Sequence, residues 1–171
     1  QGLALVDTPG MGGLGAGHAA ATLSFLPFAD GLILTSDASA ELSAPEVEFL
    51  QRAVELCPTV LFAQTKTDLY PAWERIVDIN RGHLARAGID IPIVAVSSTL
   101  RTAALARRDR DLNERSRFPE LIEALGTRVV NPAKEIAEER SKSDIRGITT
   151  LVRSALDDER DPLPRRVEPG V

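Results

Sequence analysis

The sequence is poor in the residues that build disulfide frameworks, metal centres and base-stacking surfaces. Its 171 residues include one cysteine, Cys57, so a disulfide within the chain and a cysteine-rich zinc site are both excluded. The two histidines, His18 and His83, are too few to favour a histidine-based metal centre. Aromatic residues make up 4% of the chain, which argues against a surface that stacks nucleic-acid bases.

Charge and hydropathy narrow the class of protein further. The chain has 20 Lys and Arg against 25 Asp and Glu, a net charge of -5, so we expect no nucleic acid as a partner. No apolar run reaches the roughly 18 residues that a membrane-spanning helix needs. The scarcity of cysteine fits a reducing compartment, and the sequence therefore predicts a cytoplasmic protein. With 43% hydrophobic residues, the composition is that of a globular domain with a core.

Four short apolar runs, rich in branched side chains, are spaced along the chain. Each is nearly continuous rather than alternating, which is typical of parallel strands covered on both faces. Helical patterns lie between them, and strand alternating with helix predicts an α/β fold around a parallel sheet. The predicted strands are Leu3–Val6, Gly31–Thr35, Thr59–Ala63 and Ile91–Val96.

The last part of the chain has a different pattern. Asn131 followed by Pro132 is a good helix start, because asparagine caps and proline suits the first helical turn. Apolar residues from Ile136 to Leu156 then recur on one helical face, which predicts a long carboxyl-terminal helix. Residues 161–171 hold three prolines and a glycine, and we expect a disordered tail there.

A polar tetrapeptide, D-T-P-G, follows the first predicted strand. It consists of Asp7, Thr8, Pro9 and Gly10. In an open α/β sheet, ligands bind outside the carboxyl ends of the strands. A carboxylate there can orient a magnesium-bound water, and a glycine amide can approach a terminal phosphate without a side chain in the way. These residues are therefore predicted to bind a nucleotide, with Asp7 serving the metal ion.

A second polar cluster, T-K-T-D, follows the third predicted strand and contains Thr65, Lys66 and Asp68. A carboxylate at this place can accept two hydrogen bonds from the edge of guanine, which adenine does not offer. The methylene stem of Lys66 can lie along the plane of the base. Ser97 and Ser98 follow the fourth predicted strand and can close the base pocket. The cluster predicts guanine recognition.

Taken in this order, the three motifs resemble the second half of a GTPase domain. Thr65 stands where most GTPases carry asparagine, and this resembles the dynamin-like GTPases of the bacterial type, as does the Phe118-Pro119-Glu120-Leu121 helix. The resemblance covers Leu3 to Leu125. It implies a three-layer, P-loop GTPase-like parallel sheet within residues 1–128, followed by the start of a helical stalk or bundle over residues 129–160.

The same resemblance implies a function for the intact protein. Such a protein would bind GTP and magnesium, hydrolyse GTP and remodel membranes as a mechanochemical protein. It would form a homo-oligomer through its GTPase domain and stalk. It would contact membrane lipid through regions outside this chain, which makes peripheral membrane association an expectation.

The sequence also departs from the family pattern. It contains no G-x-x-x-x-G-K-[ST] phosphate loop, and Met11 stands where small GTPases carry the glutamine that orients water. In the family the phosphate loop precedes D-x-x-G, so we expect it to lie before Gln1. The sheet is then incomplete, with about four strands, and we expect no useful GTP hydrolysis from this chain alone.

Other interpretations of the same residues remain open. Gly10, Gly12 and Gly15 spell G-x-G-x-x-G, and Asp37 follows about twenty residues on, which also fits a Rossmann-type dinucleotide-binding protein. The apolar face of the carboxyl-terminal helix fits a non-catalytic interaction module. Ser97 and its neighbour Ser98 also fit the cap of a following helix, with no role in a pocket.

Overall fold

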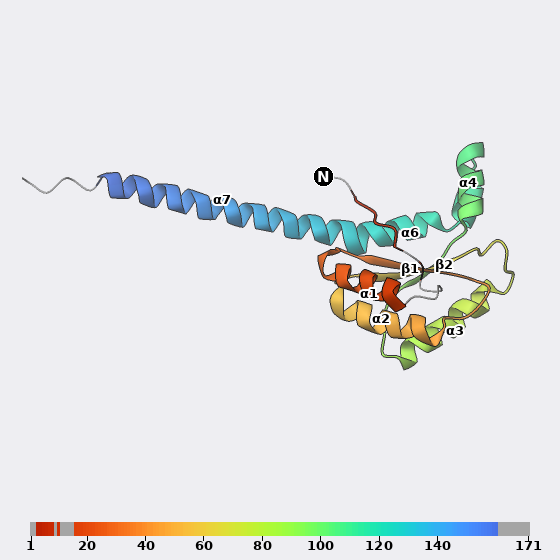
Figure 1. The fold of residues 1–171 in the computed structure, drawn as a ribbon. Coiled ribbons are helices and arrows are strands. Elements are labelled where there is room, and N and C mark those ends of the chain that lie inside the picture. Colours follow the sequence, from red (N-terminus) through yellow and green to blue (C-terminus); the bar gives the residue numbers. More distant parts are fainter. Residues whose placement is uncertain (1–2, 9, 11–15, 161–171) are drawn as a thin grey trace, which may run out of the picture. The chain divides into compact units, whose positions relative to one another are not determined.

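The computed structural model of the protein describes residues 3–8, 10 and 16–160, and Figure 1 shows its ribbon. The chain divides into two units, residues 1–131 and residues 132–171. The first unit contains the sheet and most of the helices. The described part of the second unit is one long helix, which we treat separately.

The first unit is an α/β structure built on three parallel strands in the order β1-β2-β3. Helices α2 and α3 make the crossovers between consecutive strands, as parallel pairing requires. The predicted α/β class and parallel sheet are confirmed. The elements up to the third strand are α1 (Ala16–Phe25), a 3₁₀ turn (Leu26–Phe28), β1 (Leu32–Asp37), α2 (Ala44–Leu56), β2 (Val60–Thr65), α3 (Trp73–Arg86) and β3 (Ile93–Ala95).

The first predicted strand is wrong, and so is the expected number of about four strands. Residues 3–6 form no strand, and Leu3, Leu5 and Val6 are 60%, 78% and 64% exposed. An apolar run becomes a strand only when a neighbouring strand satisfies its backbone hydrogen bonds. Within the part of the chain that the structure describes, β1 pairs with β2 alone, so no further strand extends the sheet toward this segment.

Local sequence signals explain where the two crossover helices begin and end. The backbone amide of Ser43, the residue before α2, donates to Glu46 Oε2 at 2.7 Å, and Pro45 lies in the first turn. After α3 the chain reverses at Gly88, whose φ of +72° lies in the left-handed region that favours glycine. Both helices lie between predicted strands, where the sequence indicated helical patterns.

The main core lies between one face of the sheet and helices α2 and α3. Leu34 of β1 and Phe62 of β2 are partners in the strand register, so their side chains lie on the same face of the sheet. They meet Leu50 of α2 and Leu84 of α3, and Phe62 and Leu50 are completely buried. Figure 1 shows α1, α2 and α3 together on this side.

Helix α6 covers the other side of the sheet (Figure 1). The π-helical turn after it approaches the sheet closely: Val129 lies over Gly31, and the Thr59 hydroxyl donates to the carbonyl oxygen of Arg128 at 3.0 Å. The unit thus has helices on both faces of the sheet, in three layers. The elements after β3 are α4 (Ser98–Arg107), α5 (Arg110–Arg115), α6 (Phe118–Leu125) and the π-helical turn (Gly126–Val130).

The second unit is represented by α7 (Asn131–Arg160), which confirms the predicted long carboxyl-terminal helix. Ile145, Ile148 and Val152 on its apolar side are all exposed. No helix in the described ranges has both the length and the apolar character that a membrane crossing requires. The predicted tail, residues 161–171, lies outside the described residues.

Gly31 generates a prediction about stability. A β-carbon added there would lie 2.8 Å from Val129 Cγ2, and β-branched valine has little rotamer freedom with which to move away. We expect Gly31→Ala to lower the free energy of unfolding by about 1–3 kcal/mol, as measured by urea denaturation.

Gly82 in α3 is the matched control, because an added β-carbon meets nothing within 4 Å. Gly82→Ala should stabilise the helix by about 0.5–1 kcal/mol, since glycine is the poorer helix former. If Gly31→Ala were as stable as Gly82→Ala, the close approach of the π-helical turn to the sheet would be contradicted.

Candidate functional site

The candidate site lies at the carboxyl ends of the three strands. The register pairs Asp37 at the end of β1 with Thr65 at the end of β2, and Gln64 with Ala95 of β3. Because the strands are parallel, the segments that follow them leave from the same edge of the sheet. Residues 37, 65–68 and 97–98 therefore gather there, although they are widely separated in sequence.

Asp68 and Ser97 are brought into direct contact at this edge. The Ser97 hydroxyl donates to Asp68 Oδ1 at 2.6 Å, a short distance typical of a hydrogen bond to a charged acceptor. Ser97 is completely buried, whereas Asp68 is exposed to solvent. A carboxylate has lone pairs for several donors, so the contact orients Asp68 and leaves it able to accept more hydrogen bonds.

Ser97 also caps a helix, so the alternative role considered from the sequence is real. Its Oγ accepts a hydrogen bond from the Leu100 amide at 3.0 Å at the start of α4. One hydroxyl thus both caps α4 and holds Asp68. Ser98, the first residue of α4, is exposed and has no part in this contact.

Lys66 forms an ion pair with Asp37 across the β1–β2 edge. Its Nζ lies 2.8 Å from Asp37 Oδ2, and its backbone has a φ of 59°, in the left-handed region. The hydrogen bonds from Lys66 and from Ser39 hold the pKa of Asp37 at about 2, below its usual value of 3.8. The same pairing raises the pKa of Lys66. Asp37 is therefore ionised throughout the physiological range.

Thr65 stabilises the turn rather than pointing a free hydroxyl outward. Its Oγ1 donates to the Ser36 carbonyl at 3.2 Å, which links the end of β2 to β1. The Thr67 amide then donates to the Val96 carbonyl at 3.4 Å, which links the same turn toward β3. The T-K-T-D turn is held on both sides by its neighbours.

Buried amide side chains lie beneath this turn, and the sequence reasoning missed them. Gln64 and Asn80 are both fully buried, and Asn80 Nδ2 donates to Gln64 Oε1 at 2.8 Å. Gln64 Nε2 donates to the Asp37 carbonyl at 2.9 Å, and Asn80 Oδ1 accepts from the Leu42 amide at 2.8 Å. The one signal in the sequence was a glutamine at the end of an otherwise apolar strand.

The segment after Ser97 is also attached to the site. The Ser97 amide donates to the carbonyl of Ser116 at 3.0 Å, and Ser116 is fully buried. The guanidinium of Arg117 lies 5.2 Å from the centre of the Trp73 ring, a cation–π contact with the start of α3. The end of the charged stretch before α6 is thus linked to Ser97 and to the start of α3.

The structure leaves the D-T-P-G part of the prediction untested. Asp7, Thr8 and Gly10 are exposed and lie in no helix or strand, and Pro9 is outside the described residues. Among the described residues, no hydrogen bond joins Asp7 or Gly10 to residues 65–68. Within residues 3–8, 10 and 16–160, no three or more His, Cys, Asp or Glu side chains form a cluster that could hold a metal ion. The predicted metal role of Asp7 stays a prediction.

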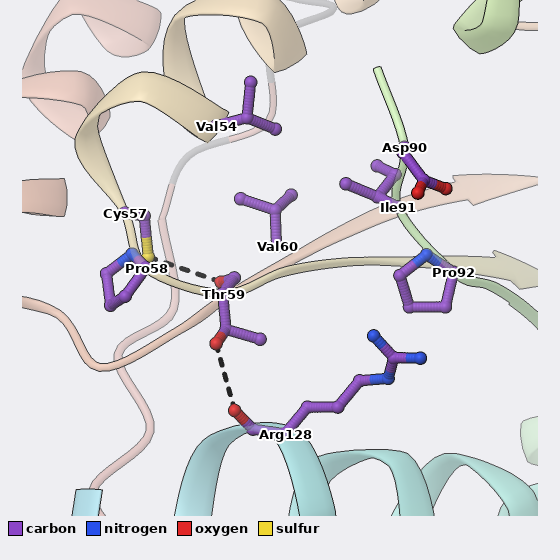
Figure 2. A pocket seen from close by; sticks show the side chains of 9 residues that line it. All are labelled: Val54, Cys57, Pro58, Thr59, Val60, Asp90, Ile91, Pro92 and Arg128. Carbon is purple, nitrogen blue, oxygen red and sulfur yellow. Dashed lines mark hydrogen bonds between the residues drawn. The ribbon is translucent and has the colours of Figure 1, made fainter. Parts of the chain in front are cut away.

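A groove of about 400 Å³ lies at the opposite, amino-terminal ends of β2 and β3 (Figure 2). Asp90 and Arg128 line it together with apolar side chains such as Val54 and Ile91. Cys57 is buried in its wall, where burial raises the pKa of the thiol and disfavours the reactive thiolate. None of the sequence-predicted site residues lines this groove.

The chain is homologous to isoniazid-induced protein IniA of Mycobacterium tuberculosis. It is 44% identical to IniA of strain CDC 1551/Oshkosh over 158 residues, which is 92% of this chain, and the match to IniA of strain H37Rv is the same. The chain spans about a quarter of the length of these relatives. No family model matches the chain.

The buried amide pair yields a prediction about stability. Asn80→Ala removes the hydrogen-bond partner of the Leu42 amide and the partner of Gln64 Oε1, and both groups are then buried without a protein partner. We expect the free energy of unfolding to fall by about 2–4 kcal/mol in denaturant titrations. Gln51→Ala is the control: this exposed amide makes one bond of 3.3 Å to the Ala87 carbonyl, and its loss should cost less than about 0.5 kcal/mol. If both variants lost the same free energy of unfolding, the buried amide pair would contribute no more to stability than an exposed hydrogen bond.

The Asp37–Lys66 pair predicts a pH dependence. A carboxyl group whose pKa is lowered in the folded state stabilises it above its unfolded pKa and loses that effect as the pH falls through the folded value. The stability difference between the protein and Asp37→Asn should therefore be constant near neutral pH and shrink between about pH 4 and pH 2. Urea titrations across this range measure it, with exposed Asp30→Asn as the control. A difference that persists at the acid end would contradict the pairing.

Proposed function

We propose that the first unit of this chain supplies the guanine-recognition part of a GTP-binding domain of the dynamin-like type. The observation that carries the proposal is the Asp68–Ser97 hydrogen bond of 2.6 Å beside Lys66, at the carboxyl edge of a parallel sheet. Asp68 is exposed to solvent yet held in one orientation. A carboxylate so placed is suited to accept the two N–H groups of a guanine edge.

Each of the neighbouring residues has a role in this proposal. Lys66 offers its methylene stem to the flat face of the base, and Ser97 orients Asp68 from beneath. Thr65 stabilises the turn through its bond to Ser36. Ser98 borders the pocket from the exposed first turn of α4.

The nucleotide phosphates and magnesium belong to the same proposal. Asp7 would orient a magnesium-bound water, and the Gly10 amide would meet the terminal phosphate, with Thr8 and Pro9 in the same loop. The 171 residues contain no G-x-x-x-x-G-K-[ST] motif, so in this proposal sequence other than this chain would supply the phosphate loop.

For the whole protein we propose GTP hydrolysis, self-association and the remodelling of membranes from a peripheral position. Homology to IniA over 92% of this chain gives coarse support to the dynamin-like assignment. The three motifs and their positions in the sequence support the choice of nucleotide. Helix α7, with its exposed apolar side chains, would begin the stalk.

Base selectivity tests the proposal directly. Asp68→Asn in the full gene product should weaken GTP binding by about tenfold or more, because a hydrogen bond to a charged group contributes roughly 1.5–3 kcal/mol. Preference should shift toward xanthosine triphosphate, whose base offers an acceptor where guanine has a donor. Equilibrium binding of both nucleotides with magnesium is the measurement.

The control for this test is Asp90→Asn, an exposed carboxylate in the groove at the opposite ends of the strands. It should leave both affinities unchanged. Unaltered selectivity in Asp68→Asn would remove Asp68 from the base pocket. Protection from thermal unfolding by NAD, with no effect of guanine nucleotides, would favour the dinucleotide-binding alternative.

A further inference from the structure

Asp37 is the residue at this edge whose side chain the nucleotide-binding motifs leave unexplained. It ends β1, about thirty residues before the T-K-T-D turn, and it belongs to no motif in the proposed guanine site. Its carboxylate nevertheless reaches the lysine of that turn, with Oδ2 2.8 Å from Lys66 Nζ. The contact joins two strands at the place where the base would lie.

Hydrogen bonds to both the side chain and the backbone carbonyl of Asp37 fix its position. Its Oδ1 accepts hydrogen bonds from both the amide and the hydroxyl of Ser39. Its backbone carbonyl accepts from Gln64 Nε2 at 2.9 Å, and Gln64 is oriented in turn by buried Asn80. The adjoining Ala38 amide donates to the Thr65 carbonyl at 2.9 Å. Hydrogen bonds therefore hold both the side chain and the backbone of Asp37 at the end of β1.

Lys66 is the opposite kind of residue, because without a partner it would be free to move. Its side chain is 53% exposed, and a long lysine side chain has many rotamers available when no partner holds it. The left-handed backbone at residue 66, with φ of 59°, sets the direction in which the side chain leaves the turn. The bond to Asp37 then fixes its far end.

We propose that Asp37 is a positioning residue for nucleotide binding: by holding the ammonium group of Lys66, it lays the apolar stem of that lysine across the place of the base and keeps its charge away from Asp68. This inference rests on the function proposed above. Asp68 is two residues away in the same turn, and without Asp37 its carboxylate would be an alternative acceptor for the ammonium group. An ion pair between Lys66 and Asp68 would block the carboxylate that reads the base.

Loss of Asp37 should lower the affinity for the nucleotide without changing the preference for guanine over xanthine. Asp37 touches no edge of the base in this arrangement, so its loss leaves the choice between guanine and xanthine to Asp68. What is lost is the prior ordering of Lys66, and ordering one long side chain on binding costs about 0.5–1.5 kcal/mol. The affinity for guanosine diphosphate should therefore fall between about twofold and tenfold.

The experiment measures guanosine diphosphate and xanthosine diphosphate binding by the full gene product with magnesium. Asp37→Asn should weaken both nucleotides by the same factor, and Asp37→Glu, which keeps the charge, should recover part of the affinity. Lys66→Met keeps the stem and removes the ammonium group. Adding Asp37→Asn to Lys66→Met should cost nothing more, because the two residues act as one unit.

Asp30→Asn is the matched control, an exposed carboxylate just before the other end of β1, and it should bind as the unaltered protein does. Circular dichroism confirms that each variant is folded. Binding by Asp37→Asn equal to that of Asp30→Asn, or additive losses in the double variant, would overturn the positioning role alone. A failure of the unaltered protein to bind any guanine nucleotide would overturn the proposed function and this inference together.

Discussion

The hydrogen bond from the buried Ser97 hydroxyl to the exposed Asp68 carboxylate, 2.6 Å long, fixes the central side chain of the candidate site to the core of the protein. Ser97 is held in place because it lies two residues after the end of β3, caps α4 and donates its amide to the Ser116 carbonyl. Asp68 lies in a solvent-exposed turn and would otherwise sample several rotamers. The orientation of Asp68, the carboxylate proposed to bind the base, is therefore set by an interior residue.

The neighbouring ends of β1 and β2 show the same construction. Exposed Lys66 pairs with Asp37, whose carbonyl is bound by buried Gln64, which is bound by buried Asn80. Buried polar groups are costly unless every member is paired, and these amides are paired. Their hydrogen bonds run from the interior outward to the charged residues. The positions of the charged residues Asp37 and Lys66 thus depend on the hydrogen bonds between the buried amides beneath them.

Much of this arrangement could be predicted from the sequence, because parallel strands have short apolar signatures and their carboxyl ends gather at one edge. The runs at residues 31–35 and 59–63 became β1 and β2, and the motif after the second of them lies at the carboxyl edge of the sheet, where it was expected. The run at residues 3–6 carried the same signature and formed no strand. A strand is a property of a pair, and the hydropathy of one segment says nothing about its neighbour.

The polar network could not be predicted for a related reason. Asn80 meets Gln64 and Leu42 only because a helix, a strand and a loop pack together, and its own segment reads as an ordinary helix. The Asp37–Lys66 pair likewise depends on register: Asp37 lies opposite Thr65, one residue before the lysine. Sequence patterns predicted the three observed strands together with one that did not form, whereas these contacts required the coordinates of both partners.

The left-handed backbone at residue 66 has a consequence for which amino acids suit this position. A glycine would adopt a φ of 59° freely, whereas a residue with a β-carbon is disfavoured there by about 1–2 kcal/mol. Judged by local backbone energy alone, lysine is a poor choice for this turn. The advantage of lysine is a long side chain that ends in a charged ammonium group. A substitution to glycine would relieve the backbone but would remove the side chain that reaches Asp37.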